Sequence, residues 1–318
     1  MKLVQKHLFS FVFLIVISWF FGCVNYRENL GKWRGMLPSL QSETDRFSFV
    51  VMGDSRSHPD IFEKLVRHIS RLNPAFVVLT GDLITSGGKN VTVDSLLKEY
   101  EIQFNEPMQP LVEAGIPLYP VIGNHDVSGG NPVSEELYCN QFNLPGNERW
   151  YSFNYGNSHF VVLNSHEFRK RHKITAEQLE WLKLDLKTTL AENIFVFIHE
   201  PAYPVKNHLG NSLDKYPADR DTLWALMNKH SVDIFFAGHE HIYHRSAHDG
   251  LLHVITGGGG APIKKWDEAK YGDLTNNAEN VTMNIHHFIF IKVMGENING
   301  MVYDIEGNIV DTFEVVSR

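Results

Sequence analysis

The residues with the clearest chemical potential lie in five short motifs, each of which begins where an apolar stretch of sequence ends. These motifs are Gly53-Asp54-Ser55-Arg56, Gly81-Asp82, Gly123-Asn124-His125-Asp126, His199-Glu200-Pro201 and Gly238-His239-Glu240-His241. Together they offer carboxylates, a carboxamide oxygen and three or more imidazoles. Hard oxygen donors combined with imidazole suit Mn, Fe or Zn, and the motifs contain none of the thiolates of a soft metal site. The motifs therefore indicate metal chemistry.

Short apolar runs that are typical of buried strands precede the motifs and must position them. They cover residues 47–52, 76–79, 118–122, 159–164, 194–198 and 233–236. The carboxyl ends of strands in an open α/β sheet lie along one edge, so we expect the motifs to converge there. A glycine before most motifs would let the backbone turn sharply and bring the next side chain inward.

Helical spacing alternates with these runs. Helices are predicted over 59–71, within 93–114, over 175–189 and over 218–229, and Thr175 with Gln178 forms a capping box at the start of the third. The sequence from 252 to 315 is rich in predicted strands. These elements predict one α/β domain with a β-rich C-terminal end.

Composition limits the alternatives. The chain has 318 residues, of which 43% are hydrophobic, which is ample for a buried core. The formal net charge of −8 argues against nucleic acid as a main partner. Two cysteines cannot form a disulfide framework or a four-cysteine zinc site, and Cys139 is expected to be an inert core residue.

The N-terminal segment has the pattern of an export signal. Lys2 and Lys6 precede an apolar run over 8–21, and Gly22-Cys23 follows. We therefore predict a lipoprotein-type signal peptide over 1–22, a tether over 23–45 and the folded domain over 46–318. Lipidated Cys23 would anchor the exported protein to a bacterial membrane, facing the periplasm or the cell exterior. The alternatives are an uncleaved signal anchor and a secreted protein.

The order of the motifs resembles the calcineurin-like metallophosphoesterase family, which includes the purple acid phosphatases, over about residues 47–261. Leu163-Asn164-Ser165, residues 178–182 and the glycine-rich residues 257–262 are also similar to bacterial members. The resemblance implies a four-layer αββα sandwich, in which two mixed β-sheets are flanked by helices. It also implies a binuclear metal centre between the sheet edges, with Mn, Fe or Zn as the metals.

The resemblance implies a role for each motif residue. The metal ligands would be Asp82 as the bridge, Asp54 and His241 at the first ion, and Asn124, His199 and His239 at the second. A hydroxide that bridges the two ions would attack a phosphate monoester or diester of a small molecule. His125 would protonate the leaving oxygen, and Asp126 would orient His125. The sequence does not fix the substrate, the metal pair or the oligomeric state.

One position departs from the family pattern. Arg56 stands where most members have a histidine ligand, and Thr85 stands where purple acid phosphatases have a compensating tyrosine. Water or His58 would then fill the vacancy at the first ion. We expect Arg56 to bind a phosphate oxygen of the substrate as a bidentate donor, the alternative being a surface arginine in a relaxed loop. The departure leaves open a second function, a family member that binds metal or a phosphorylated ligand without turnover. A third possibility is an unrelated metal-storage or interaction protein.

Overall fold

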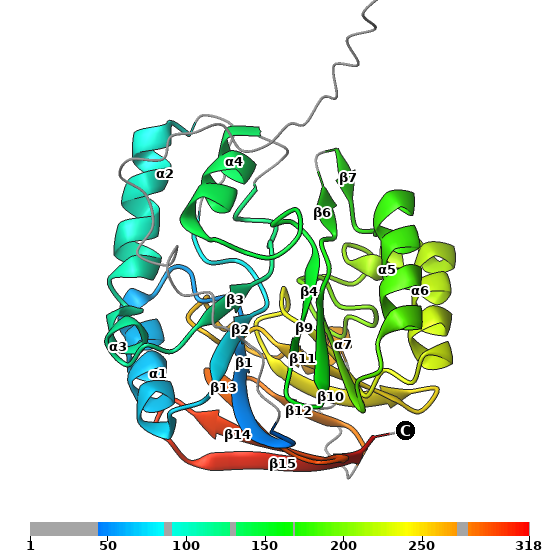
Figure 1. Cartoon of the computed structure of the whole chain (residues 1–318). Coiled ribbons are helices and arrows are strands. Elements are labelled where there is room, and N and C mark those ends of the chain that lie inside the picture. The colour runs from blue at the N-terminus through cyan, green and yellow to red at the C-terminus, as the bar shows by residue number, and fades with distance from the viewer. Residues whose placement is uncertain (1–43, 86–90, 128–131, 168, 272–278, 318) are drawn as a thin grey trace, which may run out of the picture.

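Two mixed β-sheets pack face to face and carry helices on their outer faces (Figure 1). The computed structural model describes residues 44–85, 91–127, 132–167, 169–271 and 279–317. The predicted signal peptide over 1–22, Cys23 and nearly all of the predicted tether therefore lie outside the described residues. The four-layer αββα arrangement that the family resemblance implies is confirmed.

The first sheet has six strands in the order β15-β14-β13-β1-β2-β3. Their bounds are β1 (Arg46–Met52), β2 (Phe76–Leu79), β3 (Leu118–Pro120), β13 (His287–Met294), β14 (Asn297–Asp304) and β15 (Ile309–Val316). The strands β1, β2 and β3 run parallel, so the motifs that follow them meet at one edge. The antiparallel strands β13 to β15 extend the sheet on the far side of β1.

The second sheet has seven strands in the order β12-β10-β11-β9-β8-β5-β4. Their bounds are β4 (Tyr151–Tyr155), β5 (Ser158–Val162), β8 (Asn193–Phe197), β9 (Ile234–Ala237), β10 (Tyr243–His248), β11 (Leu251–Thr256) and β12 (Val281–Met283). Strands β5, β8, β9 and β11 are parallel neighbours. A separate short hairpin joins β6 (His166–Glu167) to β7 (Lys170–Arg171).

Two groups of helices cover the sandwich (Figure 1). Beside the first sheet lie α1 (Pro59–Leu72), α2 (Val93–Glu99), a π-helix (Tyr100–Asn105), α3 (Gln109–Glu113) and α4 (Pro132–Gln141). Beside the second lie α5 (Ala176–Thr188) and α6 (Pro217–Lys229), while a 3-10 turn (Leu213–Lys215) precedes α6 and α7 (Glu268–Tyr271) is a single turn. The Thr175 hydroxyl accepts from the Gln178 amide at the start of α5, which is half of the capping box that the sequence predicts.

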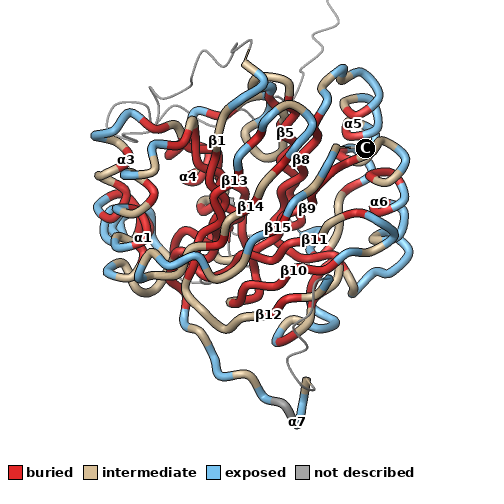
Figure 2. Tube along the Cα trace, turned by 90° about the horizontal axis from the view of Figure 1, so that it is seen from below, coloured by how far each residue is buried: buried red, intermediate tan, exposed pale blue. Residues whose placement is uncertain are grey.

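Aromatic rings fill the space between the sheets. Phe49 of β1 makes edge-to-face contacts with Phe160 of β5 and Phe195 of β8, at centroid distances of 5.2 and 5.1 Å. Phe76 of β2 meets Phe160 in the same way at 5.1 Å. Such contacts add to the hydrophobic stabilisation and fix the distance between the sheets. Figure 2 shows β8 and β9 buried, whereas β15 and the helices α5 and α6 carry many exposed residues.

Within the described residues, no helix is both long enough and apolar enough to cross a membrane.

Candidate metal centre

The metal-ligand candidates themselves make the sharp turns at the strand ends. Asp54 after β1, Asp82 after β2 and His239 after β9 have φ angles of 56°, 57° and 69°. This left-handed conformation is costly for residues other than glycine and persists only where the surroundings enforce it. The expectation that the preceding glycine supplies the turn holds for Gly81 alone, whose φ is 96°.

The other motif glycines are required because of close packing. A Cβ atom on Gly53 would lie 1.9 Å from Thr80 Oγ1. A Cβ on Gly123 would lie 2.2 Å from the Asp82 amide nitrogen. These distances are far below van der Waals contact, so a side chain at either position would push the strand ends apart. The glycines thus allow loops from different strands to approach one point.

Lone pairs converge at His199. Its Nδ1 lies 2.8 Å from the Thr80 carbonyl, which can only accept, so Nδ1 donates and Nε2 carries a lone pair. That Nε2 lies 3.0 Å from Asn124 Oδ1, 3.1 Å from His239 Nδ1 and 3.3 Å from Asp82 Oδ1. Four atoms with lone pairs therefore face one another at hydrogen-bond distance, an arrangement that a cation stabilises.

His239 is oriented for the same task. Its Nε2 lies 3.3 Å from the Asn211 carbonyl, so Nε2 donates and Nδ1 faces the other ligands. Backbone carbonyls that fix the tautomer of a histidine in this way are common behind metal ligands. Burial, followed by the neighbouring His199 and His208, holds the pKa of His239 well below its usual range, so the ring is neutral.

The electrostatics favour positive charge at this point. Burial lowers the pKa of His199, but Asp82 and Asp54 outweigh it and the net shift is upward. For Asp82 the directions are opposite. Burial would raise its pKa, but the positive charges of His199, His125 and Arg56 outweigh burial, and the net shift is downward. The Asp82 carboxylate thus stays ionised and attracts a proton or a metal ion to the same place.

Asp54 adds an unsatisfied oxygen. Its Oδ2 accepts a hydrogen bond from the His239 amide at 2.8 Å. Its Oδ1 is buried without a hydrogen-bond partner among the described residues, which is costly unless an ion completes the site. Asp54, Asp82 and His199 each offer a ligand atom, and these three atoms lie within 4.8 Å of one another. The donor set and its chemistry fit a bound metal ion.

Arg56 points into this centre. Its Nε donates to Asp82 Oδ2 at 3.2 Å, and its Nη2 lies 3.3 Å from His241 Nε2. Only 13% of the side chain is exposed, so the alternative of a surface arginine does not fit. His58, considered as a replacement ligand, has its Nδ1 2.7 Å from the Gly260 carbonyl.

His125 lies at the rim. Its amide donates to Asp82 Oδ1 at 2.8 Å, and its ring Nδ1 lies 2.5 Å from the Thr85 carbonyl. The opposite nitrogen, Nε2, lies 3.8 Å from Asp82 Oδ2 on a side chain that is 32% exposed. The ring is therefore held from behind, while Nε2 remains accessible to a substrate.

Asp126 makes different contacts from the one expected. Its carboxylate accepts from the amides of Gly123, Asp82 and Leu83 at 2.8 to 2.9 Å, whereas the carbonyl of Thr85 holds the His125 ring. Burial and the nearby Asp82 raise the pKa of Asp126 to about 7. Asp126 therefore fixes the backbones of the second and third motifs to each other.

Comparison with known proteins agrees with this geometry. The model of the calcineurin-like phosphoesterase family matches residues 47–243. The chain belongs to this family.

Two curated relatives and one solved structure show which proteins this chain is similar to. Purple acid phosphatase 23 of Arabidopsis thaliana is 27% identical over 235 residues, covering 66% of this chain and 49% of its own length. A probable cyclic nucleotide phosphodiesterase of Vesicomyosocius okutanii is 26% identical over 181 residues, covering 56% of this chain and 67% of its own length. The chain spans about half the length of the first of these relatives. The fold matches purple acid phosphatase PPD1 from yellow lupin (Lupinus luteus) seeds with a TM-score of 0.68 and 18% identity, over 86% of this chain and 54% of that one.

Two glutamates of the phosphoesterase motifs have roles that sequence reasoning missed. Glu240 accepts from the amides of Val205, Lys206 and His208. It thereby ties the 205–208 segment to the centre, where the His208 ring lies 3.7 Å from the His239 ring, centroid to centroid. The only signal in the sequence was the position of Glu240 between two predicted ligands.

The second of these glutamates, Glu200, is fully buried behind His199. Its Oε1 lies 2.6 Å from His172 Nδ1 and 3.1 Å from His166 Nε2. Burial would raise the pKa of Glu200, but His166 and His172 outweigh it and keep the pKa below its usual range. Glu200 therefore holds the β6–β7 hairpin against the back of the centre.

The glycine-rich residues 257–260 form a tight loop beside the centre. The Gly259 amide donates to the Gly53 carbonyl at 2.8 Å, and the Ala261 amide donates to the Asp54 carbonyl at 2.7 Å. A Cβ on Gly260 would lie 2.4 Å from the Ser55 carbonyl oxygen. These amides therefore hold the loop against the first motif.

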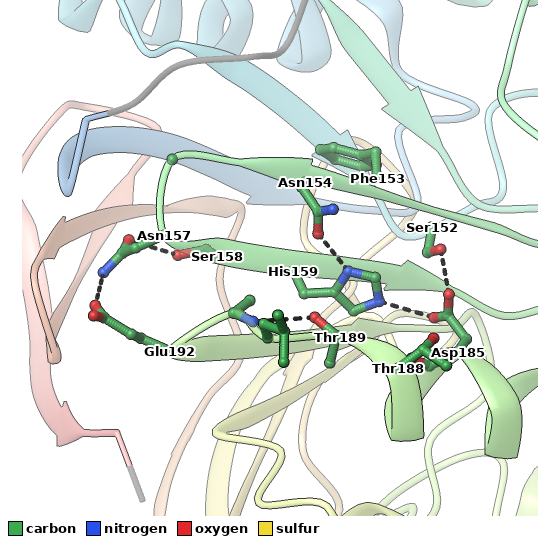
Figure 3. Close-up of a pocket in the computed structure, with 13 residues that line it drawn as sticks. Ser152, Phe153, Asn154, Asn157, Ser158, His159, Asp185, Thr188, Thr189 and Glu192 are labelled. Carbon is green, nitrogen blue, oxygen red and sulfur yellow. Dashed lines mark hydrogen bonds and ion pairs between the residues drawn. The ribbon is translucent and has the colours of Figure 1, made fainter.

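A pocket of about 620 Å³ lies at the other end of the second sheet, where β5 and β8 begin (Figure 3). His159 there is held between Asn154 Oδ1 at 2.6 Å and Asp185 Oδ2 at 2.8 Å. Ser152 donates to the same aspartate instead of to the histidine. The serine is therefore not activated as a nucleophile, and the pocket is separate from the metal centre.

Proposed function

We propose that this protein is a metal-dependent phosphoesterase that hydrolyses phosphate monoesters or diesters of a small molecule. The observation that carries the proposal is the convergence of lone pairs around His199 Nε2, from Asn124, His239 and Asp82 at 3.0 to 3.3 Å. Membership of the calcineurin-like phosphoesterase family supports the same reaction class.

Asp54, Asp82, Asn124, His199 and His239 would hold the metal. When bound, a metal ion there supplies a Lewis acid for the phosphoryl oxygens and lowers the pKa of a water molecule. Asp54 Oδ1, which has no hydrogen-bond partner among the described residues, would be stabilised by coordinating the ion. The family's arrangement with two ions would also use His241.

His125 would act as the general acid. Thr85 fixes the proton on Nδ1, so a protonated ring presents its second proton on the accessible Nε2. That proton would pass to the leaving oxygen as the ester bond breaks. The reaction needs no protein nucleophile, and the Cys139 thiol is buried in the core as predicted.

Arg56 would bind the substrate phosphate. Of the five N–H groups of an arginine, three point at Asp82, Ser57 and His241. The remaining two would donate to a phosphoryl oxygen, which anchors the substrate beside the ion. The role of Asp126 would then be to position the loops that carry Asp82 and Asn124.

The experiment compares p-nitrophenyl phosphate with its bis-ester, using purified full-length protein before and after chelation and after reloading with Mn²⁺. We expect hydrolysis that a chelator abolishes and Mn²⁺ restores. Asp82→Asn should lose turnover, whereas the exposed Asp249→Asn should keep it. Bound metal without turnover of either ester would contradict an esterase with simple substrates and favour a family member that binds without catalysis.

We also propose that the protein is exported and anchored through a lipid on Cys23, as the basic and apolar residues before it indicate. Radiolabelled palmitate should enter the wild type and Cys139→Ser but not Cys23→Ser. Equal labelling of all three proteins would contradict the anchor.

A further inference from the structure

The guanidinium of Arg56 is built into the centre by contacts on three sides. It bridges Asp82 Oδ2 and His241 Nε2, and its Nη1 donates to Ser57 Oγ at 3.2 Å. Ser57 is fixed in turn, because its amide donates to Gln103 Oε1 at 3.1 Å. The position of Arg56 is therefore supported by residues from outside its own loop.

Gln103 comes from the π-helix (Tyr100–Asn105), and its Oε1 also accepts from Thr85 Oγ1 at 2.7 Å. The irregular π turn is thus the element that supplies the support behind Arg56. Single π turns inside helices often occur at functional sites, where they redirect a side chain. This network would not be needed to hold an arginine that simply extends to solvent.

The contact with Arg56 occupies the atom of His241 that would coordinate an ion. His241 Nδ1 lies 3.0 Å from the Pro262 carbonyl, so Nδ1 donates and the single lone pair is on Nε2. Arg56 has only donors, so that lone pair accepts from its Nη2. The hydrogen bond from Arg56 would have to break before this lone pair could coordinate an ion.

On the opposite side of Asp82 the situation is reversed. Among the residues that the structure describes, the Nε2 of His199 faces lone pairs of Asn124, His239 and Asp82 Oδ1, and the arginine contact is on Asp82 Oδ2. Asp82 Oδ2 thus faces the Arg56 guanidinium, whereas Asp82 Oδ1 accepts from the His125 amide and faces the lone pair of His199 Nε2.

We infer that Arg56 takes the place of a second metal ion, so that the resting centre holds one ion on the His199 side. The inference rests on the proposed metal-dependent function and specifies how many ions that function uses. Arginine keeps its positive charge at all accessible pH values, so it neutralises Asp82 without needing metal from solution.

The test counts ions in metal-stripped full-length protein by titration calorimetry with Mn²⁺ and by elemental analysis. Electron paramagnetic resonance of the loaded protein supplies a readout that does not depend on activity. The wild type should bind one tight ion with the spectrum of an isolated Mn²⁺. Arg56→His should bind two, with the spectrum of a spin-coupled pair.

Arg220→His is the matched control, because it makes the same substitution at a site where the guanidinium packs on Tyr203. It should bind one ion. Arg56→Ala, which also frees the His241 lone pair, serves if Arg56→His does not fold, and it should gain a second, weaker ion.

Two tight ions or a spin-coupled pair in the wild type would overturn the inference but leave the proposed function intact. One ion in both Arg56 variants would also overturn it. A wild type that binds no ion would contradict the proposed function itself, so the two failures are distinguishable.

Discussion

Replacement of Gly53 by alanine tests why the first motif needs a glycine. The added Cβ would lie 1.9 Å from Thr80 Oγ1 and 3.2 Å from the Thr256 carbonyl oxygen. Gly53 does not have a left-handed φ, so the cost is steric and not conformational. Overpacking of a rigid buried site costs about 1–3 kcal/mol, and we expect Gly53→Ala near the upper end because the obstacle is fully buried.

Thr80→Ala should relieve this clash. The Thr80 hydroxyl is buried without a hydrogen-bond partner among the described residues, so its removal alone should cost less than about 1 kcal/mol. In urea unfolding of the four proteins of a double-mutant cycle, the double variant should recover at least about 1 kcal/mol relative to Gly53→Ala.

Gly115→Ala is the control for this cycle. Gly115 has a φ of 68° and no atom within 4 Å of an added Cβ, so the substitution strains the backbone without a clash. It should destabilise the protein by about 1 kcal/mol, and Thr80→Ala should not rescue it. A fully stable Gly53→Ala, or a double variant no more stable than that single variant, would refute the steric explanation.

Three further predictions concern other parts of the molecule. His125→Ala should lower kcat for a substrate with a poor leaving group by about 10²–10⁴-fold with unchanged metal content, and an unchanged kcat in steady-state assays would exclude it as the general acid. Asp311→Ala should lower the free energy of unfolding by roughly 1–3 kcal/mol, because Asp311 of β15 pairs with Arg245 of β10 across the two sheets at 3.0 Å; an unchanged urea midpoint would contradict this. Burial lowers the pKa of His244 from 6.5 to about 4, so the unfolded state binds more protons between these values and stability falls as the pH drops through them. His244→Gln should remove up to roughly 3 kcal/mol of that loss, and an identical pH dependence of urea unfolding would contradict the assignment.

The strands that carry the motifs were predictable because they are buried on both faces. The apolar run Phe76–Leu79 coincides with β2, and the helix predicted over 59–71 is α1 with one more residue. Burial in the middle of a sandwich demands continuous apolar sequence, which leaves a clear signal. The convergence of the motifs at the sheet edges followed from this placement.

Strand β10 was not predicted, and its residues explain why. Tyr243 and Arg245 are buried in it together with His244 and Ser246. They satisfy their polar groups through partners distant in the sequence, such as Asp311 for Tyr243 and Arg245. A strand that is buried by means of long-range polar contacts has no apolar or alternating pattern.

Within the site, the identities of the candidate ligands could be inferred from the sequence, but their local geometry could not. The left-handed backbone at Asp54, Asp82 and His239 is imposed by contacts between loops. The direction of Arg56 likewise depends on Ser57 and on Gln103 from a π-helix more than 40 residues away. The spacing of motifs along the sequence does not reveal contacts between segments that are distant in the chain.

The most direct test of the central claim measures bound Mn²⁺ and hydrolysis of p-nitrophenyl phosphate and its bis-ester in the same samples as metal is returned to stripped full-length protein. If the lone pairs around His199 hold the catalytic ion, turnover should rise in proportion to occupancy and stop rising when that site is full. His199→Ala should lose both together. Full turnover in the stripped protein, or a His199→Ala variant that loses the metal but keeps turnover, would contradict the account.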